Sequence, residues 1–257
     1  MTDSPVLFET RDKIAIITLN RPERRNAINA EAGQALAEAV ARLEADDALQ
    51  IGILRGEGSA FCAGMDLAAF SEGKVEELLF AKGGFGGITE AHRTKPLIAA
   101  CHGAALAGGF ELALGCDLIV AEDGCRFGLP EVLRGLVAGA GGALRLASLI
   151  PPARAREILL TGRLFDTAEA WDLGLLARRA NPGQGFEAAL ALAGEIARNA
   201  PLALRETLRL SREIERAGLD PLWSENARTL KAIMESDDAA EGAKAFLEKR
   251  APQWSGK

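Results

Sequence analysis

The chain has 257 residues, of which 48% are hydrophobic and 26% charged, and its formal net charge at pH 7 is −6. This size and composition fit one large globular domain, or one domain with an appendage, and a substantial core. The acidic balance argues against a general nucleic-acid binder, and no apolar run is long enough to span a membrane. Because the opening "MTDSPVLFET" lacks the regions of a signal peptide, we expect a soluble, cytoplasmic protein.

The four cysteines, Cys62, Cys101, Cys116 and Cys125, form no CxxC pair and none of the usual zinc spacings. We therefore expect reduced, buried thiols and no metal site. The chain has only two histidines and no tyrosine. If the protein is an enzyme, carboxylates are the expected proton carriers.

The first elements are a hairpin and a helix. "VLFET" and "IAIITLN" flank the charged turn "RDK", which is typical of two paired strands. Residues 30–46 have the periodicity of an amphipathic helix, and Asn29 is suited to cap its first turn.

Three buried strands are then predicted at residues 51–56, 96–101 and 117–122. Strands that alternate with helical segments indicate an α/β core with crossover connections. Between them, residues 81–90, "AKGGFGGITE", are rich in glycine but lack the GK[ST] ending of a phosphate-binding loop, so we expect a flexible loop.

From about Pro151 the segments are mostly helical and are separated by proline and glycine. We place the α/β core at residues 1–195 and a helical oligomerisation region at residues 196–257. Phe165 and Trp171, in "FDTAEAWDLGL", are expected in the core.

The stretch "HGAALAGGFELALGCD" carries the carboxylate of Glu111 among small and apolar residues, just after a glycine pair. Burial of a carboxylate is costly unless it is paired or hydrogen-bonded. Glu111 follows a predicted strand and a glycine pair, and the segment "FCAGMD" likewise follows another predicted strand. Two such turns could direct free N–H groups at one point and form an oxyanion hole.

A second carboxylate, Glu131, follows "FGLP", where Pro130 fixes the entry into the next element. Two carboxylates can divide acid and base roles around one water molecule. The spacing alone does not bring Glu111 and Glu131 together, and for each a structural ion pair or a helix-start interaction is at least an equal alternative to catalysis.

Six stretches, in order and over nearly the whole chain, resemble the enoyl-CoA hydratase/isomerase family, the crotonases. These are "LNRPERRNAIN", "GEGSAFCAGMDL", "HGAALAGGFELALGCDLIVAE", "RFGLPEVLRGLVAGAGGALRL", "LLTGRLFDTAEAWDLGLL" and "FLEKRAPQW". The resemblance implies a crotonase-type α/β spiral of ββα units with a C-terminal helical trimerisation region. It also implies a homotrimer or a dimer of trimers, and a coenzyme A thioester as substrate rather than a tightly bound cofactor or a metal.

The resemblance assigns the oxyanion-hole N–H groups to Met65 and Gly108. Ala107 stands where the family's "GGGxE" motif has its first glycine, and we expect only a small change in the loop. Glu111 and Glu131 match the two glutamates of the family's hydratases. There, the pair holds a water that is added across the 2,3-double bond of an enoyl-CoA.

The resemblance also indicates residues that contact coenzyme A. For the basic ones a solvated surface charge is an equal alternative, and for Asp66 a structural role is favoured over a catalytic one. The predicted set is Arg24, Arg25, Ala27, Ala63, Asp66, Leu67 and Lys249, the last acting from a neighbouring subunit.

Three functions remain open. The first is a 2-enoyl-CoA hydratase. The second is another reaction on the same scaffold: double-bond isomerisation, or dehydration of a specialised hydroxyacyl-CoA such as carnitinyl-CoA. The third is a non-catalytic CoA-binding protein, against which the retained glutamates and oxyanion-hole positions argue.

Overall fold

The computed structural model describes residues 4–66, 82–217, 228, 230, 232 and 235–257. The chain forms two compact units, Met1–Ala193 and Gly194–Lys257. Each is described by itself, and the assignment of the second to oligomerisation stays a prediction.

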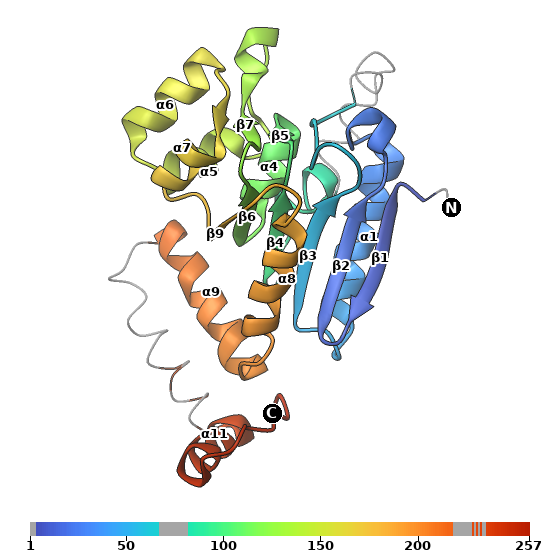
Figure 1. The fold of residues 1–257 in the computed structure, drawn as a ribbon. Helices are drawn as coiled ribbons and strands as arrows, with labels where there is room; N and C mark the ends of the chain where they lie inside the picture. Colours follow the sequence, from blue (N-terminus) through green and yellow to red (C-terminus); the bar gives the residue numbers. More distant parts are fainter. Residues whose placement is uncertain (1–3, 67–81, 218–227, 229, 231, 233–234) are drawn as a thin grey trace. The chain divides into compact units, whose positions relative to one another are not determined.

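A six-stranded sheet forms the frame of the first unit (Figure 1). Its order is β1 (Val6–Arg11), β2 (Ile14–Leu19), β3 (Ile51–Gly56), β4 (Leu97–Cys101), β6 (Leu118–Glu122) and β9 (Arg178–Ala180). β1 and β2 are the predicted antiparallel hairpin, and all the other neighbours are parallel. The three predicted buried strands and the α/β class are confirmed.

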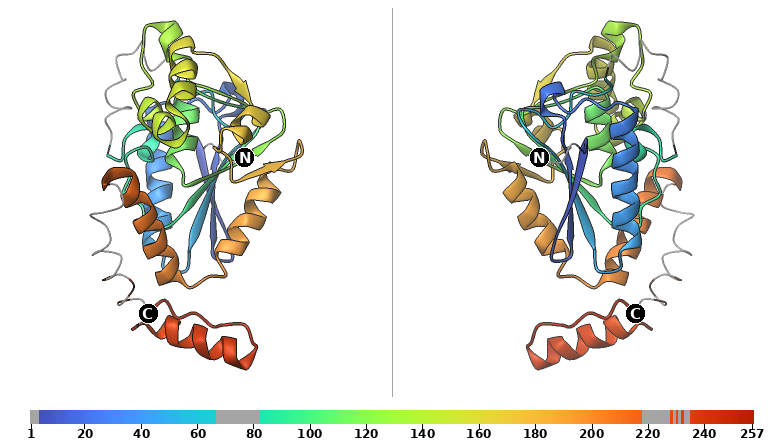
Figure 2. Two further views of the ribbon diagram at one scale, coloured as in Figure 1. Left: turned by 90° about the vertical axis from the view of Figure 1, so that its left-hand side faces the viewer. Right: turned by 90° about the vertical axis from the view of Figure 1, so that its right-hand side faces the viewer.

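The two faces of this sheet are covered by α1 (Ala30–Ala45) and α8 (Gly185–Ile196), as Figure 2 shows. The Asn29 side chain caps α1 as predicted, because its Oδ1 accepts a hydrogen bond of 2.9 Å from the Ala32 amide. The start of α8 contacts the sheet, because the guanidinium of Arg55 in β3 lies 4.7 Å from the Phe186 ring centroid.

A second, three-stranded sheet has the order β5 (Ala104–Leu106), β7 (Arg126–Gly128) and β8 (Phe165–Asp166). Phe110, Phe127 and Phe165 pack between it and the helix that follows β5, with ring centroids 5.3 to 5.8 Å apart. Phe165 is thus in the core as predicted. Trp171 is not, since 45% of it is exposed.

Helical elements surround this second sheet. They are α4 (Gly108–Gly115), the 3-10 turn η3 (Pro130–Arg134), α5 (Gly142–Leu149), α6 (Pro152–Thr161) and α7 (Thr167–Asp172). The short helix α7 buries Thr167 and Ala170. Trp171 falls outside that buried stripe of the helix, which explains its exposure.

The prediction of a flexible loop is wrong for the glycine-rich residues that the structure describes. Residues 84–89 are buried, and Phe85–Gly87 form the 3-10 turn η2, packed against α1 and α4. A Cβ added to Gly86 would lie 2.9 Å from Leu112 and 3.1 Å from Leu36. Here the missing side chain permits close packing.

The second unit contains the predicted helices α9 (Pro201–Ala217) and α11 (Asp237–Glu248). Its carboxyl-terminal residues are held by Asp238, which is 3% exposed and accepts a hydrogen bond of 2.6 Å from the Ser255 amide. The Trp254 indole also donates to the Arg198 carbonyl at 2.6 Å.

All four cysteines are buried free thiols, as predicted. Across the described ranges, no helix combines the length and apolar character needed to cross a membrane.

Candidate active site

Two backbone segments meet where β3 and β4 continue into new elements. The Cys62 amide donates to the Ala104 carbonyl at 3.1 Å, and the Leu106 amide donates back to Cys62 at 3.0 Å. These hydrogen bonds hold the segment after β3 against β5, the strand that leads into α4. The two turns predicted to form an oxyanion hole are therefore neighbours.

The amides of Met65 and Gly108 lie close together at this junction. A Cβ on Gly108 would be 3.4 Å from the Met65 nitrogen, and one on Gly64 would be 3.1 Å from the Gly108 nitrogen. Among the described residues, no backbone carbonyl accepts from either N–H. Both donors are therefore available to a ligand.

Ala107 sets the start of α4. Its backbone has φ 50° and ψ −129°, and its carbonyl accepts from the amides of Phe110 and Glu111 at 2.8 and 3.0 Å. This conformation favours glycine, so the alanine carries strain in order to leave Gly108 as the first residue of the helix.

Glu111 is 4% exposed and lies in the first turn of α4. Its Oε1 accepts a hydrogen bond of 2.8 Å from the Gly142 amide at the start of α5. The pKa of Glu111 is raised from 4.5 to about 7: burial is the largest cause and the nearby Glu131 also raises it, while the Gly142 and Ala140 amides and the charge of Arg145 act in the opposite direction. Near neutral pH this carboxyl can therefore give or take a proton.

Glu131 lies in η3, which Pro130 begins and Gly135 ends in a left-handed conformation. Both of its carboxylate oxygens are buried, and neither has a hydrogen-bond partner in the described part of the chain. Burial raises the pKa of Glu131. Two buried oxygens without a partner are costly unless a water or ligand supplies a donor.

The structure therefore brings together the four residues predicted to do the chemistry. Two amide donors lie at the start of α4, Glu111 is one turn further along it, and the charge of Glu131 is close enough to act on Glu111. Such a site can stabilise a negative charge developing on a carbonyl oxygen and move protons next to it.

Four residues of the predicted CoA-binding set lie on two segments that are joined by hydrogen bonds: Arg25, Ala27, Ala63 and Asp66. The Ala63 amide donates to the Arg25 carbonyl at 2.9 Å, and the Arg21 guanidinium bonds both the Ala27 carbonyl and, at 3.0 Å, the Asp66 carboxylate. This turn thus lies against the segment that presents Met65. The ion pair with Arg21 agrees with a structural role for Asp66.

The other residues predicted to contact coenzyme A are exposed or lie outside the described part of the chain. Arg24, like Arg25, is exposed on the turn, and Lys249 is exposed in the second unit. Leu67 lies outside the described residues.

Two residues at the site were not singled out from the sequence. Gly142 donates to Glu111, and the Arg145 guanidinium lies against the neighbouring Gly141. The only signal was the glycine-rich run "GAGGALRL", which begins a helix. Nothing in that run indicates which side chain it approaches.

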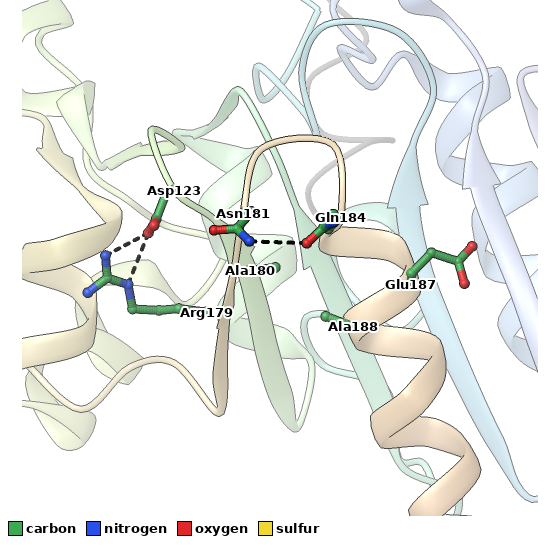
Figure 3. A pocket seen from close by; sticks show the side chains of 7 residues that line it. All are labelled: Asp123, Arg179, Ala180, Asn181, Gln184, Glu187 and Ala188. Carbon is green, nitrogen blue, oxygen red and sulfur yellow. Dashed lines mark hydrogen bonds and ion pairs between the residues drawn. The ribbon is translucent and has the colours of Figure 1, made fainter.

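A separate hollow of about 530 Å³ lies between β9 and α8 (Figure 3). Two pairs of its polar side chains are hydrogen-bonded: Asp123 accepts from Arg179 at 2.7 Å, and Asn181 donates to Gln184 at 3.2 Å. It contains none of the predicted site residues.

No cluster of three or more histidine, cysteine, aspartate or glutamate side chains suited to a metal ion occurs among the described residues.

The similarities to other proteins extend over almost the whole chain. A family model described as enoyl-CoA hydratase/isomerase matches residues 9–257. Carnitinyl-CoA dehydratase of Proteus mirabilis (strain HI4320) is 40% identical over an alignment of 254 residues, and the match covers 96% of this chain and 97% of that protein.

Solved structures agree. Enoyl-CoA hydratase from Mycobacterium tuberculosis H37Rv superposes with a TM-score of 0.95 at 48% identity and covers 99% of this chain and 100% of its own. Carnitinyl-CoA hydratase from Mycobacterium avium superposes with a TM-score of 0.78 at 38% identity, with 100% of both chains covered. The predicted crotonase-type fold is confirmed.

Proposed function

The chain belongs to the enoyl-CoA hydratase/isomerase family, and from that premise we propose that it reversibly adds water across the 2,3-double bond of a 2-enoyl-CoA. The product is a 3-hydroxyacyl-CoA, so the protein is a hydro-lyase. One observation carries the proposal: two buried, electrostatically coupled carboxylates lie beside two free amide donors.

In this mechanism the thioester carbonyl accepts from the Met65 and Gly108 amides. Water binds between Glu111 and Glu131, which share one proton. As the water oxygen bonds to C3, one carboxylate takes a water proton and the negative charge moves to the thioester oxygen. The other carboxyl gives its proton to C2, so one water is added in total. The unpartnered oxygens of Glu131 suit such a bound water.

Coenzyme A enters as part of the substrate, with no tightly bound cofactor and no metal. We assign its binding to the turn with Arg24, Arg25 and Ala27 and to the adjoining Ala63, with Lys249 supplied by a neighbouring subunit. Replacing both arginines by alanine should raise KM with little change in kcat. An unchanged KM at low salt would show that the two arginines do not bind coenzyme A.

We also propose a homotrimer or a dimer of trimers. Apolar side chains stay exposed on elements that contact one another in the first unit, including Leu133 at 65%, Leu144 at 79% and Leu160 at 73%. Monomers rarely expose large apolar patches, so this surface suits association. Sedimentation equilibrium would test the stoichiometry.

A specialised dehydratase is the second candidate, favoured by relatives named carnitinyl-CoA dehydratase at 40% identity. The same carboxylate pair would run the reaction in the direction of water loss. A double-bond isomerase would need only one of the two carboxylates.

The deciding experiment measures turnover of crotonyl-CoA, a 3-enoyl-CoA and carnitinyl-CoA by wild type, Glu111→Gln and Glu131→Gln. Exposed Glu187→Gln, on α8, is the control. A hydratase consumes crotonyl-CoA fastest and loses that activity in both site variants. Preference for carnitinyl-CoA selects the dehydratase, and activity on the 3-enoyl-CoA that survives one replacement selects the isomerase. CoA binding without any turnover refutes the proposal.

A further inference from the structure

We propose that Arg145 is a positioning residue for Glu111, acting through the turn at residues 140–142. Its catalytic meaning rests on the proposed function, but its effect on Glu111 can be measured without turnover. Arg145 takes no part in the proposed mechanism, and its guanidinium links the start of α5, which bonds Glu111, to the segment after η2, which packs on α4.

The guanidinium of Arg145 folds back over the start of its own helix. A Cβ added to Gly141 would lie 2.1 Å from its Nη1, so the group occupies the space directly beside the Gly141 backbone. The opposite nitrogen, Nη2, donates to the carbonyl of Thr89, which is fully buried just after η2. Arg145 thereby connects the beginning of α5 to the segment that packs on α4.

The turn that Arg145 supports is the one that holds Glu111. Besides donating to Oε1, Gly142 is so close that an added Cβ would lie 2.9 Å from both Cγ and Oε1 of Glu111. A shift of this turn by a few tenths of an ångström would therefore change both the hydrogen bond and the space available to the carboxylate. The guanidinium, as a rigid planar donor, suits this supporting role.

The charge of Arg145 acts on Glu111 as well as its packing. Two charged groups act on Glu111 from neighbouring elements: Glu131 of η3 raises its pKa and Arg145 of α5 lowers it. At the other end of α4, Arg145 and the Arg93–Asp117 ion pair act on the Cys116 thiol. Arg145 thus partly offsets the Glu131 charge and favours the ionised form of Glu111.

The test compares Arg145→Gln and Arg145→Lys with Arg156→Gln, which makes the same change at an exposed position of α6. Protein labelled with ¹³C at the glutamate carboxyl carbon is titrated by NMR. The Glu111 resonance is assigned as the one missing in Glu111→Gln. This titration reports the Glu111 pKa whether or not the protein is a hydratase.

In Arg145→Gln we expect the Glu111 pKa to rise above its wild-type value. We also expect kcat on crotonyl-CoA to fall about tenfold or more, with a smaller change in KM. Arg145→Lys keeps the charge but lacks the planar fork, so it should shift the pKa less and still lose kcat. The control should match wild type in both.

An unchanged Glu111 titration in both Arg145 variants would overturn the inference and leave Arg145 a purely structural link. If Arg145→Gln does not fold, Arg145→Lys decides: a wild-type titration of Glu111 refutes the proposal, and a shifted titration supports it. Failure of wild type to turn over any acyl-CoA would refute the proposed function without touching the titration result.

Discussion

Helix α4 and the 3-10 turn η3 each carry one of the two carboxylates, and they differ in how firmly they hold it. Every residue of α4 from Gly108 to Leu114 is buried, and Glu111 accepts a hydrogen bond from Gly142. No residue of η3 is fully buried, and the enclosed oxygens of Glu131 have no partner among the described residues.

This contrast separates two effects of burial. In both places burial raises the carboxyl pKa, but only Glu111 has its orientation fixed before a ligand arrives. Glu131 is left with unsatisfied acceptors, which a water or substrate can fill. One carboxylate is preorganised, and the other depends on what binds.

The largest expected effect comes from removing the two carboxylates, singly or together. Glu111→Gln and Glu131→Gln should each lower kcat by about 10²–10⁴-fold, since each removes a proton-transfer group. If both act on one water, the double variant should be about as slow as the worse single variant. Steady-state kinetics on crotonyl-CoA measures this, and a multiplicative loss would contradict a shared water.

Gly142→Ala tests the preorganised side of the comparison. The new Cβ would lie 2.9 Å from the Glu111 Oε1 and force the carboxylate to move. We expect kcat to fall by about 10²-fold and the free energy of unfolding by about 1–3 kcal/mol. Urea unfolding and kinetics give both values.

The control for that substitution is Gly194→Ala in α8, where an added Cβ would have no atom within 4 Å apart from its chain neighbours and the backbone of its own helix. Alanine in a helix should stabilise it by up to about 1 kcal/mol. Wild-type kcat in Gly142→Ala would show that Glu111 is not held by this contact.

The pH dependence of stability tests the burial of Glu111. Because its folded-state pKa is raised from 4.5 to about 7, the folded protein binds this proton more tightly than the unfolded chain. Stability from this group should therefore fall as pH rises from about 4.5 to 7 and then level off, by about 3 kcal/mol at most.

Glu111→Gln should flatten that part of the profile. Urea unfolding of wild type and the variant at intervals between pH 4.5 and 8 measures the difference. Parallel profiles would mean that Glu111 is not desolvated in the folded protein.

The smallest expected effects come from two reciprocal backbone changes. Ala107 precedes α4 at φ 50°, and Gly135 ends η3 at φ 70° with open space where a Cβ would be. Ala107→Gly should raise the free energy of unfolding, and Gly135→Ala should lower it, each by about 1 kcal/mol. Thermal unfolding measures both, and shifts of the same sign would contradict the strain assigned to Ala107.

Elements whose signal is local could be predicted from the amino-acid sequence. The hairpin, the capped helix α1, the buried strands and the helical second half follow from hydrophobic periodicity, capping and turn residues, which act over a few positions. The resemblance to a family then assigned Met65, Gly108, Glu111 and Glu131, because their motifs are short and specific.

The contacts between these groups could not be predicted in this way and are seen only in the folded chain. Gly84, Gly86 and Gly87 predict mobility from composition, yet they let their own segment pack closely against α1 and α4. Trp171 is apolar but lies outside the buried stripe of a short helix. The contacts of Gly142 and Arg145 with the Glu111 site join segments distant in the sequence. Long-range packing sets such contacts, so they leave no periodic signal in the chain.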